Sequence, residues 1–582
     1  MHLNFFRMRR LTIILLISLF PIALLASGYR AVVIPVEFSD LTFNNTSTGV
    51  QHKATIAGRY FTDQFSPSLS FSFEVLPTIR LSMPYAWYGA NSSTLKDIRI
   101  GELIREATKK CGVNLSVYDN DGDGFIDNIY IVAAGSSEAE GSGADHLWPQ
   151  QAKLSERGEA FQADGKTVDN FAVCTETSSP GVFCHEFAHV LGLQDMYDTD
   201  GSGSGGLSNG LWGTLSLMDK GIAGSSDCLP PNFCAIELEQ LGLGTRIASS
   251  LGPRRLRPVS SYKEYLRIDS DTDGEYYLIE CRKEEGWDAG IGGGGLVIYH
   301  IDRSENNSWY SDLYMRNLSA RERWDFNQVN CRPDHPCARV ITAVPSTTEL
   351  SRIFFPQPGH NSFASDTDPA FGFWNGEASN LALDNITLES DGSVRFNLIA
   401  PVSVMETHVF QDAMIINWKT ADVLDVRTCN VLWYKNEARG NVQLLGSAVA
   451  QRQEDGMFFT VIEDLEPSTD YSIFIRALSQ NGRSYSKTIQ LSTKGIQKGV
   501  RPFIYLNTLK RREDGSFYVG DKIPMRVYNL EGADQVLWYF NGMRMRPESD
   551  GYWHLTQSGT LKVEIWYEDD SMEIITRKMI VK

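Results

Sequence analysis

The segment 185–195, HEFAHVLGLQD, contains the side chains best suited to chemistry in this chain. His185 and His189 are four residues apart, so on a helix both imidazoles lie on one face and can reach the same cation. Glu186 can reach a metal-bound water without being a ligand; zinc lowers the pKa of that water to about 7, and the carboxylate takes its proton. The spacing predicts a zinc helix in which the two histidines are ligands and Glu186 is the general base.

A third ligand is expected shortly after this helix. Gly192 suits the left-handed turn that ends a helix, and such a turn would bring the following residues back towards the metal. Asp195 then offers a carboxylate oxygen, a normal zinc ligand, at a position where related zinc motifs have histidine. We expect Asp195 to be the third zinc ligand, with Asp198 and Glu176 as the alternatives.

Met218 lies downstream in SLMDKG, after the glycine-rich segment GSGSGG. This arrangement is typical of the Met-turn that lies beneath the metal in metzincin proteases. An ordinary methionine of the core would give the same pattern, since methionine fills irregular gaps in many cores. We expect a Met-turn at Met218.

A second cation site is predicted in the segment 119–127, DNDGDGFID. Its carboxylates recur at alternate positions and would repel one another unless a cation or water screened them. An EF-hand loop needs a glutamate at its twelfth position, where Tyr130 stands, so the loop is of another kind. A polar turn before a strand is the alternative. We expect a structural calcium ion bound by the side chains of Asp119, Asp121, Asp123 and Asp127 and the carbonyl of Phe125.

Length and charge limit the remaining possibilities. The chain has 582 residues, which is too long for one hydrophobic core and suggests about three to five domains. Its net charge of −18 argues against nucleic acid or an anionic membrane surface as the main partner. Two close cysteine pairs, 228 with 234 and 331 with 337, could form small disulfide loops or remain thiols.

Residues 1–27 have the pattern of a secretory signal peptide. Arginines 7, 9 and 10 precede the apolar run 11–25, and small residues follow at the spacing of a cleavage site. An uncleaved anchor helix is the alternative, but the run falls short of the ~20 residues that a membrane span needs. We expect a bacterial protein that is secreted or lies at the cell surface, with no stable membrane span in the mature chain.

The order of expected elements predicts several domains. Strands over 30–40 and 126–135 and helices over 52–65 and 95–109 predict an α/β or α+β catalytic domain over 28–255. Strands and loops then predict a β-rich extension over 256–400. LEPSTDY, with Trp418 on an early strand, resembles a fibronectin type III β-sandwich over 401–495. Further short strands predict an immunoglobulin-like β-sandwich over 496–582.

Several stretches in order resemble the immune inhibitor A-like family of secreted bacterial zinc metalloproteases. They cover about residues 29–400: RAVVIPVEFSD, YFTDQF, PYAWYGAN, YDNDGDGFIDNIYIVAAG, HLWP, FCHEFAHVLGLQDMYDTD, LWGTLSLMDKG, LPPNFCAIELEQLGLG and EYYLIECRKEEGWDAGIGGGGLVIYHID. The resemblance implies a metzincin-like zinc endopeptidase with His185 and His189 as ligands and Glu186 as base. It also implies that Asp195, the type of residue the family has there, is the third ligand.

The expected function is therefore hydrolysis of peptide bonds in extracellular proteins, by a water activated by zinc and deprotonated by Glu186. The expected partners are protein or peptide substrates and, through the C-terminal sandwiches, a cell-surface or matrix protein or glycan. Two other functions stay open. One is a surface adhesin or binding protein whose metalloprotease domain is inactive, which the intact Glu186 argues against. The other is a zinc hydrolase of a non-peptide amide.

Overall fold

The computed structural model describes most of the chain after the predicted signal peptide, which lies outside the described residues, as does most of the glycine-rich segment. The described residues are 28–582 apart from 45–47, 94, 202–209, 220–227, 438–440, 453–455, 481, 496–501, 505, 507–515, 529, 531 and 547–551. Two compact units are present: Met1–Asn361 with Asn385–Phe396, and Ser362–Asp384 with Asn397–Lys582. Among the described residues, no helix has the length and apolarity that a membrane crossing requires.

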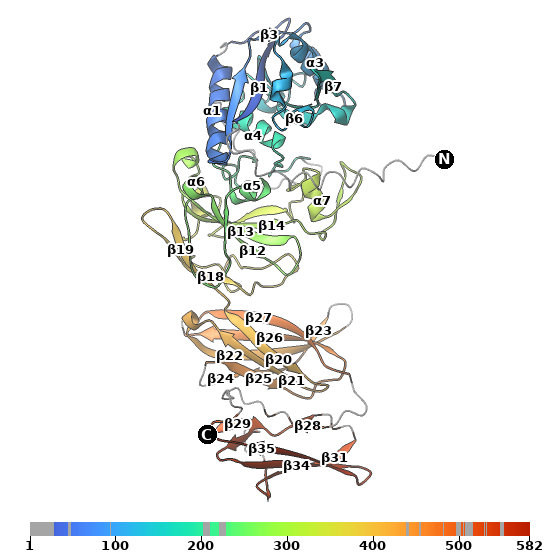
Figure 1. The fold of residues 1–582 in the computed structure, drawn as a ribbon, viewed down its shortest axis with the longest axis vertical. Coiled ribbons are helices and arrows are strands. Elements are labelled where there is room, and N and C mark those ends of the chain that lie inside the picture. The colour runs from blue at the N-terminus through green and yellow to red at the C-terminus, as the bar shows by residue number, and fades with distance from the viewer. Residues whose placement is uncertain are drawn as a thin grey trace, which may run out of the picture. The chain divides into compact units, whose positions relative to one another are not determined.

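The first unit begins with a sheet that is parallel except at one edge. Its strand order is β2-β1-β5-β9-β6; β6 runs antiparallel to β9, and β3 pairs with β1. Figure 1 labels β1, β3 and β6 of this sheet. The bounds are β1 Gly28–Glu37, β2 Ser70–Val75, β3 Ile79–Arg80, β5 Ile129–Ala133, β6 Gln150–Lys153 and β9 Asn170–Thr175.

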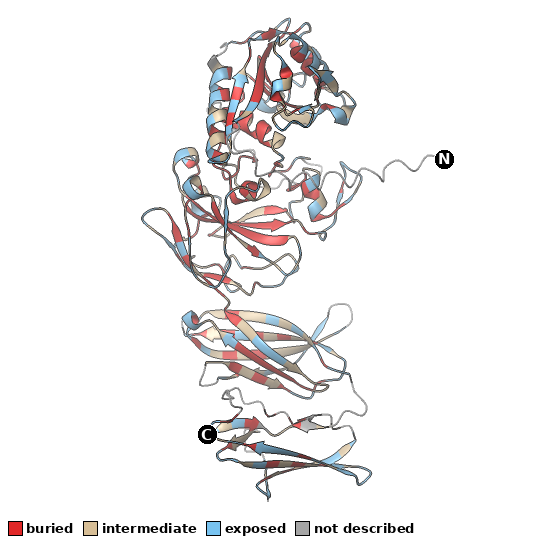
Figure 2. Ribbon diagram, in the orientation of Figure 1, coloured by how far each residue is buried: buried red, intermediate tan, exposed pale blue. Residues whose placement is uncertain are grey.

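Helices cover both faces of this sheet because successive side chains of a strand point to opposite faces. Ala31 and Val33 of β1 pack in one core with α1 (Thr48–Phe65), whereas Val32 and Ile34 pack in another with α3 (Ile100–Lys110). Strand β5 is accordingly buried along its whole length, and β1 is buried from Ala31 to Val36 (Figure 2). The result is a three-layer α/β arrangement, in agreement with the α/β alternative predicted from the sequence.

The helix predicted over 95–109 begins later than expected, at Ile100. Asp97 has a positive φ of 47°, which a helix does not allow. Its N–H donates to Asn91 Oδ1 (2.9 Å), and its carboxylate accepts from the N–H of Trp148 (3.0 Å). These contacts hold the preceding residues in a turn, which the hydrophobic spacing did not reveal.

Small elements complete this part of the unit. They are α2 Tyr85–Tyr88, the helical turns Leu115–Tyr118, Glu138–Glu140 and Leu154–Arg157, and a three-stranded sheet of β4 Phe125–Ile126, β8 Lys166–Val168 and β7 Phe161–Ala163.

A second sheet, in the order β10-β12-β13-β14-β17, follows in the same unit. The strands expected from EYYLIECR and GGLVIYHID are confirmed as β13 and β14, and every residue of both is buried. The bounds are β10 Thr245–Ile247, β12 Glu264–Asp269, β13 Glu275–Arg282, β14 Gly295–Asp302 and β17 Ala338–Ile341.

The other elements around this sheet are short. They are α5 Ala235–Gln240, α6 Val259–Tyr262, α7 Ala320–Asp325, the hairpin of β15 Trp309–Ser311 and β16 Arg316–Leu318, the turns Gly286–Asp288 and Leu350–Arg352, and a sheet of β11 Gly252–Leu256, β19 Val394–Ile399 and β18 Ala382–Leu388. None of the nine cysteines, all of which are described, forms a disulfide.

The second unit contains two four-stranded sheets around a shared core, in the orders β20-β21-β25-β24 and β23-β22-β26-β27. Trp418 and Tyr471 are both buried there, and the Tyr471 hydroxyl accepts from the N–H of Glu466 (2.8 Å). The bounds are β20 Val402–Val409, β21 Met414–Thr420, β22 Val426–Asn436, β23 Val442–Val449, β24 Gln451–Arg452, β25 Phe458–Ile462, β26 Asp470–Ser479 and β27 Ser484–Ser492, with a helical turn Asp422–Leu424.

The same unit includes Ser362–Asp384, from the region predicted as an extension of the catalytic domain. Arg483 of the sandwich binds Asp366 (3.1 Å) and Asp384 (2.7 Å), and Ala364 lies in the sandwich core.

A further β-rich part ends the chain, with a four-stranded sheet β32-β31-β34-β35 and two strand pairs, β28-β30 and β29-β33. The bounds are β28 Phe503–Ile504, β29 Asp521–Pro524, β30 Val527–Tyr528, β31 Ala533–Phe540, β32 Met543–Arg544, β33 Tyr552–Leu555, β34 Gly559–Tyr567 and β35 Met572–Met579.

Candidate metal centre

The histidine motif lies on α4, Pro180–Val190, which follows strand β9. The Ser179 side chain caps the helix by accepting from the N–H of Val182 (3.0 Å), and Pro180 occupies the first turn, where its missing N–H costs nothing. The helix ends at Val190 with Leu191 as its C-cap, and Gly192 follows with a φ of +98°. The N–H of Leu193 donates to the carbonyl of Ala188 (3.2 Å), the bond of a Schellman cap. The left-handed turn predicted at Gly192 is therefore confirmed.

Three ligand atoms converge after this turn. His185 Nε2 lies 3.2 Å from His189 Nε2, and Asp195 Oδ1 lies 3.0 Å from the first and 3.3 Å from the second. All three side chains are almost entirely shielded from solvent, and the two imidazole rings stand nearly perpendicular, at 88°. The atoms therefore surround one point from different directions.

The other ring nitrogens determine which atoms face this point. His185 Nδ1 lies 2.9 Å from the carbonyl of Leu217, and His189 Nδ1 lies 2.8 Å from the carbonyl of Leu193. A carbonyl oxygen can only accept, so each Nδ1 carries a proton, and in the neutral imidazole each Nε2 then presents its lone pair. This arrangement is the usual second-shell support of metal-binding histidines.

Asp195 supplies the negative charge of the cluster. Its Oδ1 is buried and accepts no hydrogen bond within the described part of the chain, as a ligand oxygen would require. Burial lowers the pKa of His185, but Asp195 outweighs it and raises that pKa to about 9. Burial raises the pKa of Asp195, but the two histidines hold it well below its usual range. Two nitrogens and one carboxylate oxygen that attract positive charge fit a zinc ion.

Glu186 lies on the same helix and is 6% exposed. Burial raises the pKa of its carboxyl group, Asp195 adds to the rise, and the two histidines oppose it. A raised pKa brings a carboxylate closer to the range in which it can both take and return a proton near neutral pH.

Met218 lies below the motif in a buried turn. The carbonyl of Leu217, the residue before it, is the acceptor for His185 Nδ1, and the carbonyl of Met218 accepts from the N–H of Met196 (2.8 Å). The buried Glu237 of α5 accepts from the N–H of Met218 (3.1 Å) and so fixes the turn from below. The turn thus connects the zinc helix to the loop that carries Asp195.

The alternative third ligands lie in other surroundings. Asp198 groups with Asp200 and Cys331, and not with the two histidines, among the described clusters that could hold a metal. Glu176 accepts from the N–H of Asn44 (2.9 Å) through Oε1 and from the N–H of Gly135 (3.2 Å) through Oε2. Both carboxylates therefore already belong to other local networks.

The predicted calcium loop is only partly assembled. Oxygens of Asp119, Asp121 and Asp123 lie within 4.8 Å of one another. Lys166 Nζ lies 2.5 Å from Asp119 Oδ2, so an ammonium already offsets part of the charge. Asp127 Oδ2 instead accepts from the N–H of Asn120 (2.8 Å). The structure thus groups three of the four predicted carboxylates.

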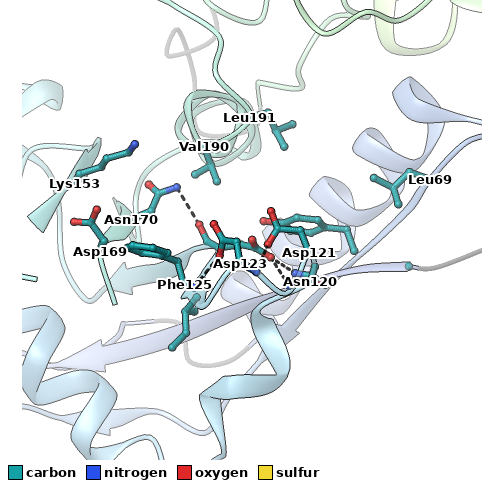
Figure 3. Close-up of a pocket in the computed structure, with 14 residues that line it drawn as sticks. Leu69, Asn120, Asp121, Asp123, Phe125, Lys153, Asp169, Asn170, Val190 and Leu191 are labelled. Atoms are coloured by element: carbon teal, nitrogen blue, oxygen red, sulfur yellow. Dashed lines mark hydrogen bonds between the residues drawn. The ribbon is translucent and has the colours of Figure 1, made fainter. Parts of the chain in front are cut away.

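A cavity of about 470 Å³ opens beside this loop (Figure 3). Asp121, Asp123 and Phe125 line it together with Val190 and Leu191 from the end of α4. None of the three converging ligand residues lines it, so the cavity is adjacent to the metal centre but is not part of it.

Sequence analysis missed two residues that support the centre. Glu237 lies in an ordinary helix-start pattern, and nothing in its neighbourhood indicates a bond to Met218. Asn327 is hydrogen-bonded to Asp195 although 132 residues separate them. Only an alignment of related chains or a structure could have linked such distant positions.

Two imidazole nitrogens and a buried carboxylate oxygen, with a glutamate adjacent in the sequence, form a cluster on a three-layer α/β fold that could hold a metal ion. Residues 29–228 match a family model described as the catalytic domain of immune inhibitor A peptidase M6. This match confirms the resemblance to the immune inhibitor A family over residues 29–228.

Two relatives match this chain over lengths similar to that of the family model. "Pre-pro-metalloprotease PrtV" of Vibrio cholerae serotype O1 is 31% identical over 203 residues, which is 29% of this chain and 22% of that protein. "Immune inhibitor A" of Bacillus thuringiensis subsp. alesti is 26% identical over 179 residues, or 25% and 26% of the two chains. The matched region thus spans about a quarter of these relatives.

Solved structures also match over short lengths. The fibronectin type III domain of human collagen alpha-1(XX) is 21% identical and covers 17% of this chain and 86% of that one, with a TM-score of 0.14. The FN5 domain of Drosophila Lar is 17% identical and covers 16% and 98%, with a TM-score of 0.13.

Proposed function

We propose that this protein is a secreted zinc-dependent endopeptidase that hydrolyses peptide bonds of extracellular proteins. The observation that carries the proposal is the convergence of His185 Nε2, His189 Nε2 and Asp195 Oδ1 within 3.3 Å, beside the buried Glu186. The match of residues 29–228 to a peptidase catalytic domain supports it independently.

The residues divide the work between binding and proton transfer. His185, His189 and Asp195 hold the zinc ion through the three converging atoms. Zinc bound there supplies Lewis acidity toward the scissile carbonyl and toward a water molecule. The Glu186 carboxylate takes a proton from the attacking water and passes it to the amine that leaves. Burial raises the pKa of Glu186, which makes its carboxylate a stronger base for taking the proton from water.

A metzincin-like catalytic domain is part of the proposal. Met218 supports it, because its turn lies under the zinc helix and accepts from the loop of Asp195 through the N–H of Met196. We assign residues 28–255 to the catalytic domain and 256–400 to its extension. Residues 401–495 are assigned to a fibronectin type III-like sandwich, which the buried Trp418 and Tyr471 support, and residues 496–582 to an immunoglobulin-like sandwich.

The proposed partners follow from this organisation. The catalytic domain takes protein or peptide substrates, and the sandwiches hold the enzyme on a cell-surface or matrix protein or glycan. The net charge of −18 supports the exclusion of nucleic acid.

The full mature chain incubated with unfolded casein tests this function. We expect internal cleavage that stops when 1,10-phenanthroline removes the metal and returns when zinc is restored. Fragment masses measured by mass spectrometry will show whether the cuts are internal. Failure to cleave casein or a diverse peptide library would contradict the proposal and favour an adhesin or a hydrolase of another amide.

We also propose a structural calcium ion at Asp119, Asp121 and Asp123. Ligand binding to the folded state stabilises it by RT ln(1 + [L]/Kd), about 2.7 kcal/mol at 100 times Kd. Adding 5 mM Ca²⁺ to the chelator-treated, zinc-reloaded chain is expected to raise Tm by about 5 °C in calorimetry.

The double variant Asp121→Asn, Asp123→Asn is the matched control and should lose the shift, because two of the three ligand charges are gone. An identical Tm with and without Ca²⁺ in the unsubstituted chain would show that the loop is only a polar turn.

A further inference from the structure

Asn327 lies just after α7, in the region beyond the matched catalytic domain. Its φ is +52°, a left-handed conformation that asparagine tolerates better than most residues. Its N–H donates to the carbonyl of Trp324 (3.3 Å), so the end of α7 determines where its side chain begins. This placement brings a carboxamide from the extension to the predicted zinc ligand.

The carboxamide makes two hydrogen bonds to a single residue. The N–H of Asp195 donates to Asn327 Oδ1 (2.7 Å), and Asn327 Nδ2 donates to Asp195 Oδ2 (2.7 Å). The first bond requires an acceptor, which fixes the orientation of the amide and leaves Nδ2 to face the carboxylate. Because Oδ2 is engaged in this way, Oδ1 is the oxygen turned towards the two histidine Nε2 atoms.

Further contacts fix the same segment to the loop after Asp195. Thr199 Oγ1 donates to the carbonyl of Asn327 (2.7 Å), and Asn330 Nδ2 donates to the carbonyl of Met196 (2.8 Å). Asn330 is completely buried, and its Oδ1 accepts from the N–H of Ala338 on β17 (3.0 Å). The sheet of the extension therefore supports the loop on which Asp195 lies.

We propose that Asn327 is a positioning residue of the metal centre, so that the site is completed by the extension and not by residues 29–228 alone. The inference rests on the proposed zinc site. Partners that orient ligand side chains typically change metal affinity by about 10–100-fold when they are replaced. Asn327 orients the only acidic ligand, which carries the charge that attracts the cation.

The test compares zinc affinity in the full chain, measured by competition with a chromophoric chelator, for Asn327→Asp and Asn330→Ala. Asn327→Asp keeps the size of the side chain and the acceptor for the N–H of Asp195, but it replaces the donor at Oδ2 by a carboxylate. We expect a loss of zinc affinity of about 10–100-fold. Asn330→Ala loosens the same segment without touching the carboxylate, and its affinity should change much less than that of Asn327→Asp.

The Tm of the metal-free chain separates positioning from general destabilisation, because Asn330→Ala should lower it at least as much as Asn327→Asp. Should Asn327→Asp fail to fold, Asn327→Gly tolerates the left-handed φ and should still lose about tenfold in affinity. Wild-type affinity in the folded Asn327 variant, or equal losses in the Asn327 and Asn330 variants, would overturn the inference while the zinc site stands. A wild-type chain that binds no zinc would overturn both.

Discussion

Replacing Glu186 with glutamine is expected to lower kcat/KM for casein-derived peptides by about 10²–10⁴-fold while zinc remains bound. Glutamine keeps the shape of the side chain but can neither accept the proton from water nor return it to the amine. The buried setting of Glu186 leaves no room for solvent to replace it readily. Single-peptide kinetics and zinc content, measured on the same preparation, separate loss of the base from loss of the metal.

The comparison is Glu237→Gln, since Glu237 is also buried but supports the Met218 turn and does not lie beside the ligands. Its effect should appear mainly in the free energy of unfolding. Cleavage at the wild-type rate by the Glu186 variant would eliminate the proposed base.

The Asp195→Ala variant is expected to bind zinc more than about 100-fold more weakly. Losing a ligand should weaken binding more than losing a residue that only orients a ligand. The substitution also removes the carboxylate oxygen that lies 3.0 Å from His185 Nε2 and 3.3 Å from His189 Nε2. Zinc per chain after dialysis against a competing chelator, measured by elemental mass spectrometry, gives the result directly.

Asp198→Ala provides the matched comparison, because Asp198 is a buried carboxylate three residues along the same loop. It should retain zinc. Full retention in Asp195→Ala together with loss in Asp198→Ala would move the third ligand to Asp198.

The zinc helix was predictable because its determinants are local. His185 and His189 are brought together by helical spacing alone, and Gly192 needs only a positive φ, which its residue type allows. The parallel strands were predictable for a similar reason, since a run such as Ile129–Ala133 is apolar throughout and buried on both faces.

The residues that orient the candidate ligands were not predictable, because they lie far from those ligands in the sequence. Asn327 and Glu237 reach the centre through tertiary packing, and neither has a local sequence signal for that role. The start of α3 was missed because the positive φ of Asp97 is stabilised by Asn91 and Trp148, contacts that hydrophobic periodicity does not encode. The sequence therefore predicted the side chains that could bind a metal, whereas the residues that orient them could be identified only from the fold.

Anomalous diffraction from crystals of the zinc-loaded full chain, recorded on both sides of the zinc absorption edge, tests the central claim most directly. We expect one strong zinc peak within about 2.0–2.2 Å of His185 Nε2, His189 Nε2 and Asp195 Oδ1. A zinc peak among Asp198, Asp200 and Cys331, with none between the two histidines, would contradict it.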